Sequence, residues 1–221
     1  HDDQGLASTS APSRVVVLPT LIPSGSQWKY LSDGSDPGPS WRNLSFDDSG
    51  WSNGVAELGF GDGDEATVIG NATNQFVTFY FRHTLSVHDT AGITNLVVRL
   101  IRDDGGVVYL NGVEVFRSNM PTGAITSATL AAAIAEDLGN PQTFHATNVP
   151  IALLQPGDNV VAVEIHQANT TSSDVSFNLD LRPNVPPAPP QVVLTSPTNN
   201  AEFPVSAQVD LRAQATDLDS P

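Results

Sequence analysis

The sequence predicts an all-β protein built as a β-sandwich, with a short further β segment near its end. Short runs rich in β-branched and aromatic residues recur along the chain, and several of them alternate between apolar and polar residues. Clusters of turn-forming residues separate these runs. The one stretch with a clearly helical composition is 129–138, which is followed by Gly139 and Pro141.

The predicted strands follow one another along the chain. The first begins at Arg14 (RVVVLP). The others are expected at 75–87, 95–101, 106–116, 159–167 and 174–181. The run at 106–116 contains Asn111-Gly112, a hairpin turn signal, so we expect two strands, VVYL and VEVF, paired through a tight turn. A short turn of helix is a further possibility at 150–157, before the strand from Asn159.

The composition divides the chain into four parts. Residues 1–13 are small and polar and predict a flexible lead-in, while 14–182 predict the sandwich domain. Residues 183–190 are dense in proline, which predicts an extended linker. Residues 191–221 restart a strand pattern and resemble the opening strands of the immunoglobulin-like repeats of secreted bacterial proteins. Roughly 30 residues are too few to bury a core, so we expect the natural protein to continue.

The charge and composition exclude several functions. The 221 residues carry 24 acidic and 9 basic side chains, a net charge of −15, and Lys29 is the single lysine. Because phosphate backbones are bound by Lys and Arg, we expect no nucleic-acid partner. No apolar run approaches the roughly 20 residues of a membrane helix, so we expect no membrane insertion. There are no cysteines, and the loop-rich composition favours a secreted or cell-surface bacterial protein.

Four segments, taken in order, resemble one family. They are WRNLSFDDSGW (41–51), FYFRHTLSV (79–87), DDGGVVYLNGVEVF (103–116) and PGDNVVAVEIHQ (156–167). Together they are similar to the sugar-binding jelly-roll domain that precedes the catalytic barrel of family 2 glycoside hydrolases. They also resemble galactose-binding-like modules of large exported bacterial proteins. The resemblance covers about 20–182 and implies a galactose-binding-like jelly-roll, a fold that hosts sugar binding, adhesion and scaffolding alike.

Two acidic segments are candidates for calcium. The loop GDGDEAT offers Asp62, Asp64 and Glu65, whose spacing can supply several of the six to eight oxygens that calcium takes. The alternative is a solvated acidic loop. Asp103 and Asp104 enter the predicted hairpin, where an acidic pair ordinarily caps backbone amides, but they could also hold a cation or accept hydrogen bonds from sugar hydroxyls.

The candidate ligand-binding residues are one aromatic residue and a set of polar residues in turns. We expect Trp41 to be partly exposed, as a surface on which a sugar ring can stack. Phe46 and Trp51 resemble core residues of the family. The polar candidates lie in the loop between the last two strands and at the hairpin turn: Asn111, His166, Gln167, Asn169, Ser172, Ser173 and Asp174. The alternative is that these side chains only hydrogen-bond their own turns.

The sequence gives little support for catalysis. It contains no nucleophile elbow, no phosphate-binding glycine loop and no His-Glu-x-x-His pattern, and we expect its histidines to be isolated surface residues. The favoured function is a non-catalytic carbohydrate-binding or adhesion module of a larger secreted protein, with calcium as a candidate stabilising ion. The alternative is a structural spacer or docking domain, in which Trp41 and the 166–174 loop would be buried or held by internal hydrogen bonds.

Overall fold

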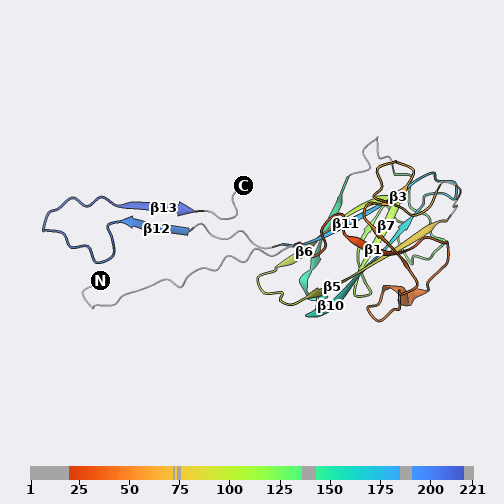
Figure 1. Cartoon of the computed structure of the whole chain (residues 1–221), viewed down its shortest axis with the longest axis horizontal. Coiled ribbons are helices and arrows are strands. Elements are labelled where there is room, and N and C mark those ends of the chain that lie inside the picture. Colours follow the sequence, from red (N-terminus) through yellow and green to blue (C-terminus); the bar gives the residue numbers. More distant parts are fainter. Residues whose placement is uncertain (1–19, 72, 74–75, 136–142, 185–190, 217–221) are drawn as a thin grey trace. The chain divides into compact units, whose positions relative to one another are not determined.

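The computed structural model describes residues 20–71, 73, 76–135, 143–184 and 191–216. The chain forms two compact units, one of Leu18–Val185 and one that includes Pro186–Pro221 (Figure 1). The predicted lead-in at 1–13, the strand predicted from Arg14 and most of the predicted linker lie outside the described residues.

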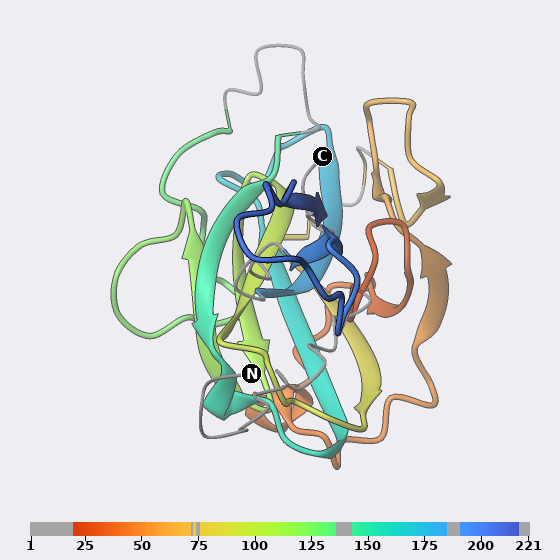
Figure 2. The ribbon, with the colours of Figure 1, turned by 90° about the vertical axis from the view of Figure 1, so that its left-hand side faces the viewer.

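The larger unit consists of two sheets. The six-stranded sheet has the order β2-β1-β5-β10-β7-β8, and the five-stranded sheet has the order β4-β3-β11-β6-β9. The first contains β1 (Gln27–Leu31), β2 (Ser52–Val55), β5 (Thr78–Val87), β7 (Gly105–Leu110), β8 (Val113–Ser118) and β10 (Gly157–His166). The second contains β3 (Leu58–Phe60), β4 (Thr67–Val68), β6 (Asn95–Asp103), β9 (His145–Pro150) and β11 (Val175–Asn184). Long strands of this unit lie side by side in Figure 2.

The predicted all-β fold is confirmed. The described pairings are antiparallel except that between β3 and β4. The predicted hairpin is β7–β8, and Asn111 and Gly112 at its turn have φ of 51° and 84°, the left-handed conformation that an Asn-Gly turn supplies. Two short 3₁₀ helices, η1 (Pro39–Arg42) and η2 (Ile151–Leu153), interrupt the strands, and η2 lies in the predicted helical turn.

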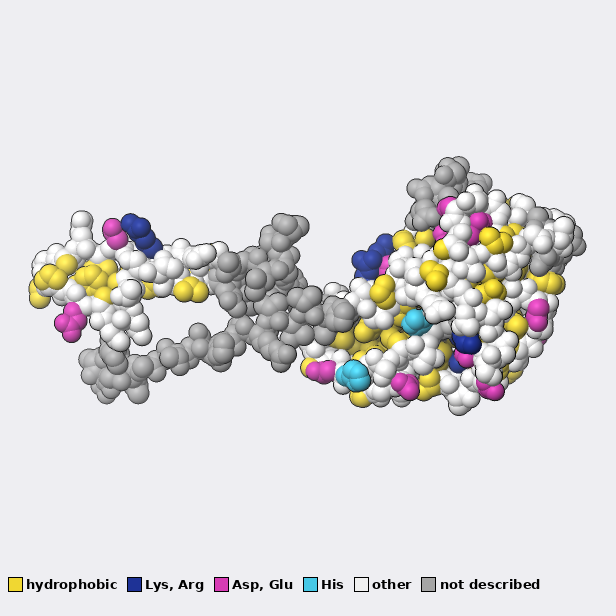
Figure 3. Space-filling view, in the orientation of Figure 1, with side chains coloured by type: hydrophobic (Ala, Val, Ile, Leu, Met, Phe, Trp, Pro, Cys, Tyr) yellow, Lys and Arg dark blue, Asp and Glu magenta, His cyan; other side chains and the backbone are white. Residues whose placement is uncertain are grey.

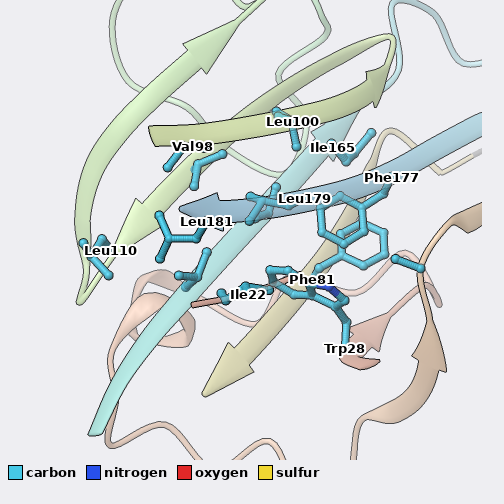
Figure 4. Packing of buried hydrophobic residues seen from close by; sticks show 14 of the residues in the cluster. Ile22, Trp28, Phe81, Val98, Leu100, Leu110, Ile165, Phe177, Leu179 and Leu181 are labelled. Atoms are coloured by element: carbon cyan, nitrogen blue, oxygen red, sulfur yellow. The ribbon is translucent and has the colours of Figure 1, made fainter. Parts of the chain in front are cut away.

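The main core lies between the two sheets (Figure 4). Alternate residues of β5 and β10 point into it, including Phe79, Phe81 and Ile165. From the opposite sheet, the ring of Phe177 stacks on Phe81 with 3.9 Å between centroids. Trp28 of β1, in the same sheet as Phe81, meets Phe177 edge-on. Apolar burial of this kind is the main stabilising contribution to a sandwich.

A second apolar cluster covers the other face of the six-stranded sheet. Tyr80, Tyr109 and Ala162 lie on this outer face and pack against Trp41 and Trp51, which come from the segment between β1 and β2. The central strands are therefore buried on both faces, and β5, β7 and β10 contain long unbroken runs of buried residues. This double burial creates the surroundings of the site described below.

The helix predicted at 129–138 is wrong over 129–135, which has no helical turn, while 136–138 lie outside the described residues. The backbone amides of this segment bond to the sandwich instead of to one another. The amide of Ala131 donates to the carbonyl of Gln167, that of Ala132 to Asn119, and that of Ala135 to the Asp104 carboxylate. Tertiary hydrogen bonds thus outweigh a weak helix propensity.

The second unit contains the short β segment that the sequence predicts. β12 (Gln191–Ser196) and β13 (Arg212–Thr216) form an antiparallel pair. Apolar side chains of this unit lie on its surface, as Figure 3 shows, and Val192, Val205 and Leu211 are more than 60% exposed. A hairpin with so little buried apolar surface has little independent stability. Among the described residues, no helix is long and apolar enough to cross a membrane.

Candidate functional site

A pocket of about 190 Å³ opens over the outer face of the six-stranded sheet. Its floor includes Tyr80 of β5 and Glu164 of β10, which point outward because their neighbours along each strand point into the main core. Its walls come from η1 with the residues before it and from the segment after β8. The residues that line it are Asp36, Gly38, Pro39, Trp41, Arg42, Tyr80, Ile125, Thr126, Ser127 and Glu164.

One wall is held in place by a buried arginine. Arg82 of β5 is 1% exposed, and its guanidinium donates to the backbone carbonyls of Trp41 and Asn43. Its Nε also pairs with the Asp48 carboxylate at 2.7 Å. These bonds fix the segment that carries Trp41 onto the sheet. Asp48 lies in a turn in which the Asp47 carboxylate accepts the amide of Ser49.

The opposite wall is held by hydrogen bonds from the 126–129 segment. The Ser127 hydroxyl donates to Asp36 at 3.0 Å, which joins the two walls across the pocket. The Thr78 hydroxyl donates to the Ser127 carbonyl at 2.8 Å. Nδ1 of His166 lies 2.7 Å from the carbonyl of Thr129, and because a carbonyl can only accept, Nδ1 carries a proton. The contacts of Thr78 and His166 tie this segment to β5 and β10.

Glu164 is the buried charge of the pocket, with 5% of its surface exposed. One carboxylate oxygen accepts the Tyr109 hydroxyl at 2.6 Å, and the other lies 3.3 Å from Nε2 of His166, which is not aligned for a hydrogen bond. Burial raises the pKa of Tyr80, and the negative charges of Glu164 and Asp36 raise it further. Burial and Glu164 likewise raise the pKa of Tyr109. Both phenols therefore remain protonated in this site.

The expectation that Trp41 is partly exposed is wrong, because only 4% of its surface is accessible. Its ring meets Tyr80 edge-on at 4.9 Å and Tyr109 edge-on at 5.9 Å, and it stacks with Trp51. The sequence shows a tryptophan in a loop but not the outer-face cluster that covers it. Trp41 is nevertheless among the residues that line the pocket.

The polar candidates of the 166–174 loop are largely engaged in internal hydrogen bonds. His166 is fully buried, contrary to the expectation of a surface histidine, and Gln167 is buried with its Nε2 donating to the Asp174 carbonyl. Asn169 accepts the amide and hydroxyl of Thr171 in its own turn. Ser173 is exposed.

Asn111 lies at the other end of β10 from His166. In the register of β7 with β10, Leu110 faces Val161 and Gly105 faces His166, so the β7–β8 turn is far from the 166–174 loop. The Asn111 amide nitrogen donates to the Leu153 carbonyl and to Asn159, and its oxygen accepts the amide of Val160. The side chain therefore braces the turn against neighbouring segments.

The acidic loop contributes to a cluster of three carboxylates. Oxygens of Asp62, Asp64 and Glu57 all lie within 4.8 Å of one another, and Glu57 is buried. Partial burial raises the pKa of Asp62 against the lowering effect of the Ser176 hydroxyl, and the nearby acidic side chains, Asp174 first, raise it further. An oxygen-rich cluster of this kind suits a hard cation.

The remaining metal candidates lie outside this cluster. The Glu65 carboxylate accepts the amides of Asp62 and Gly63 within its own loop. Asp104 is 1% exposed, and its two carboxylate oxygens accept the amides of Ala135 and Ala168. Asp103 faces Ser176 in the register of β6 with β11. Asp104 therefore binds backbone amides of two segments distant in the sequence.

Sequence reasoning missed most of the pocket. Asp36, Tyr80 and Glu164 were not among the candidates, and neither was Glu57 of the acidic cluster. The sequence does contain a signal for Glu164, which is a carboxylate within an otherwise apolar strand (VVAVEIH). A buried polar residue that lines a pocket is a candidate for a functional role.

Comparisons with known proteins found similarity only among solved structures. No family model matches the chain, and no curated protein matches it. A calcium-binding mutant of Bacteroides uniformis β-glucuronidase 2 is 15% identical, with 80% of this chain and 20% of that chain covered and a TM-score of 0.43. A glycosyl hydrolase family 2 member from Bacteroides cellulosilyticus is 14% identical over 74% of this chain and 20% of that chain, with a TM-score of 0.45.

A third similar structure is the β-glucuronidase from Ruminococcus gnavus in complex with D-glucuronic acid. It is 13% identical, with 93% of this chain and 36% of that chain covered and a TM-score of 0.46. The chain thus spans between 20% and 36% of the length of these three glycosidases. At such identities and TM-scores the similarity does not assign the chain to a family.

Proposed function

We propose that this chain is a non-catalytic carbohydrate-binding accessory module and that the outer-face pocket is its ligand site. The observation that carries the proposal is the convergence of aromatic rings, two carboxylates and a hydroxyl on one hollow. Sugar rings present C–H faces that pack on aromatic rings and hydroxyl groups that bond to carboxylates. The pocket is smaller than the roughly 300–1,000 Å³ typical of drug-sized ligands, which favours one sugar unit of a longer glycan.

The test is to block the pocket without disturbing the core. Thr126 is exposed at its edge, so Thr126→Trp should fill the opening and abolish binding of any glycan that titrates in a calorimetric panel with the full chain. Thr122→Trp is the matched control, because Thr122 is exposed on the same segment but does not line the pocket. Binding that survives Thr126→Trp would place the ligand elsewhere.

A second candidate function is a structural docking module without a free ligand. Two observations favour it: Trp41 is buried, and the 166–174 loop is held by its own hydrogen bonds. It predicts that the full chain binds no member of a broad panel of neutral, amino and acidic glycans. In that case the module would pack against a neighbouring domain of a larger exported bacterial protein.

We further propose that the cluster of Glu57, Asp62 and Asp64 binds calcium, which would stabilise the loop beside β3. The support is three carboxylates within 4.8 Å and the raised pKa of Asp62, which a bound cation would reverse. A ligand that binds only the folded state raises the melting midpoint by mass action. The full chain should melt at a higher temperature in calcium than in excess chelator, and Asp64→Asn should remove this difference. Equal midpoints in the unsubstituted chain would remove calcium from the proposal.

A further inference from the structure

The charges around the pocket indicate a ligand class, an inference that rests on the proposed function. Asp36 and Glu164 line the pocket, whereas Arg42 is the single basic residue among the lining residues. The Arg42 guanidinium lies 4.6 Å from the centroid of the Tyr109 ring, and its Nε donates to the carbonyl of Pro39. In the described part of the chain, no arginine or lysine forms an ion pair with either carboxylate.

The Glu164 carboxylate is the strongest of these observations. A buried carboxylate is costly unless a partner compensates its charge. Its partners are the neutral Tyr109 hydroxyl and, at 3.3 Å, Nε2 of His166. Nδ1 of His166 contacts Thr78 and Thr129, and its Nε2 has no hydrogen-bond partner. A cation bound in the pocket would add compensation that no arginine or lysine in the described part of the chain provides.

The aromatic rings favour the same kind of group. The rings of Trp41 and Tyr80 meet at 68° with centroids 4.9 Å apart, and both residues line the pocket. Faces of aromatic rings attract ammonium groups, most strongly where water is excluded. The raised pKa of Tyr80, to which Glu164 and Asp36 contribute after burial, reflects the same negative field.

We propose that the pocket binds a saccharide through a protonated amino group, as in a hexosamine unit that is not N-acetylated. The amino group would meet two carboxylates beside the rings of Trp41 and Tyr80, while Ser127 and backbone groups remain for the hydroxyls. A uronic acid would bring a third negative charge into the same hollow. A neutral sugar would bring no cation to Glu164.

The test compares trisaccharides by isothermal titration calorimetry with the full chain. The glucosamine trisaccharide should bind at least about tenfold more tightly than its N-acetylated counterpart or cellotriose, and trigalacturonate should not bind. Equal affinity for the N-acetylated or neutral trisaccharide would overturn the inference and leave the proposed function intact. If none of the four trisaccharides binds, the result would count against both this inference and the proposed function. Butylamine binding as tightly as the glucosamine trisaccharide would overturn recognition of a saccharide.

A matched pair of variants separates the pocket from the general charge of the chain. With a net charge of −15, the chain attracts any polycation without a specific site. Asp36 and Asp33 each accept the amide two residues ahead, but only Asp36 lines the pocket. Asp36→Asn should weaken binding of the glucosamine trisaccharide about tenfold, while Asp33→Asn, which has the same net charge, should not. Equal losses in the two variants would overturn the proposal.

Discussion

At the scale of single residues, buried charges determine how the outer face is covered. Arg82 is enclosed between the sheet and the segment that carries Trp41, and its guanidinium bonds are made to that segment. The turn that contains Asp48 can be predicted from FDDSGW, but its buried partner cannot, because the two residues are 34 positions apart. Local turns follow from local sequence, whereas long-range ion pairs depend on the completed fold.

Removal of the Asp48 carboxylate tests the importance of this ion pair. Asp48→Ala should lower the free energy of unfolding by about 2–3 kcal/mol, because a buried guanidinium loses a charged hydrogen-bond partner. Glu114→Ala breaks an ion pair with Arg117 that is more exposed at both ends, and it should cost less than about 1 kcal/mol. Urea unfolding of the two variants gives the comparison. Equal losses would mean that Arg82 finds another partner.

The raised pKa of Asp62 predicts a pH effect in calcium-free buffer. A carboxyl whose pKa is higher in the folded state favours folding at low pH, and this contribution is lost as the pH rises through the folded-state pKa. Asp62→Asn should therefore raise the melting midpoint at neutral pH and have less effect in acid, where Asp62 is already protonated. Melts of both proteins across this pH range, with chelator present, measure the difference. A variant that is less stable at neutral pH would contradict this sign.

At the scale of elements, most of the long strands could be predicted, whereas several short strands and the irregular segments could not. The apolar and β-branched pattern locates β5, β6, β7, β8, β10 and β11 closely, and Asn111-Gly112 locates the hairpin, but the pattern misses β9 and the strands from β1 to β4. The segment 129–135 was misassigned because the helix propensity of its alanines is weak and is overridden by tertiary hydrogen bonds to their amides. The pocket was missed because it depends on tertiary packing. Residues on both faces of β5 and β10 are buried, so the sequence pattern of these strands does not reveal which residues face the second cluster.

Asp104 is expected to be the main anchor of the 129–135 segment. An asparagine side chain has one acceptor oxygen, so Asp104→Asn loses one of the two amide bonds and places a donor against the other. We expect a loss of about 2–3 kcal/mol. Asp89→Asn is the control, because Asp89 accepts one amide in a surface turn and asparagine can do the same. Hydrogen exchange of the Ala135 and Ala168 amides should accelerate only in the Asp104 variant.

At the scale of the whole molecule, stability is concentrated in one unit. The apolar core and the outer-face cluster both belong to Leu18–Val185, whereas several apolar residues of β12 and β13 and of the segment between them remain exposed. In the sequence, a proline-dense stretch separates the strand patterns of the two units.

The unequal division predicts the outcome of truncation. A protein of residues 18–185 should unfold in one cooperative transition with a midpoint close to that of the full chain, because it retains both apolar clusters. The denaturant dependence of its unfolding free energy should be nearly unchanged, since this slope follows the surface exposed on unfolding. The amides of β12 and β13 should exchange rapidly in the full chain, as expected for a pair of strands without a core. A second unfolding transition in the full chain would show that 186–221 form a separately folded unit, and a clear loss of stability on truncation would show that they stabilise the larger unit.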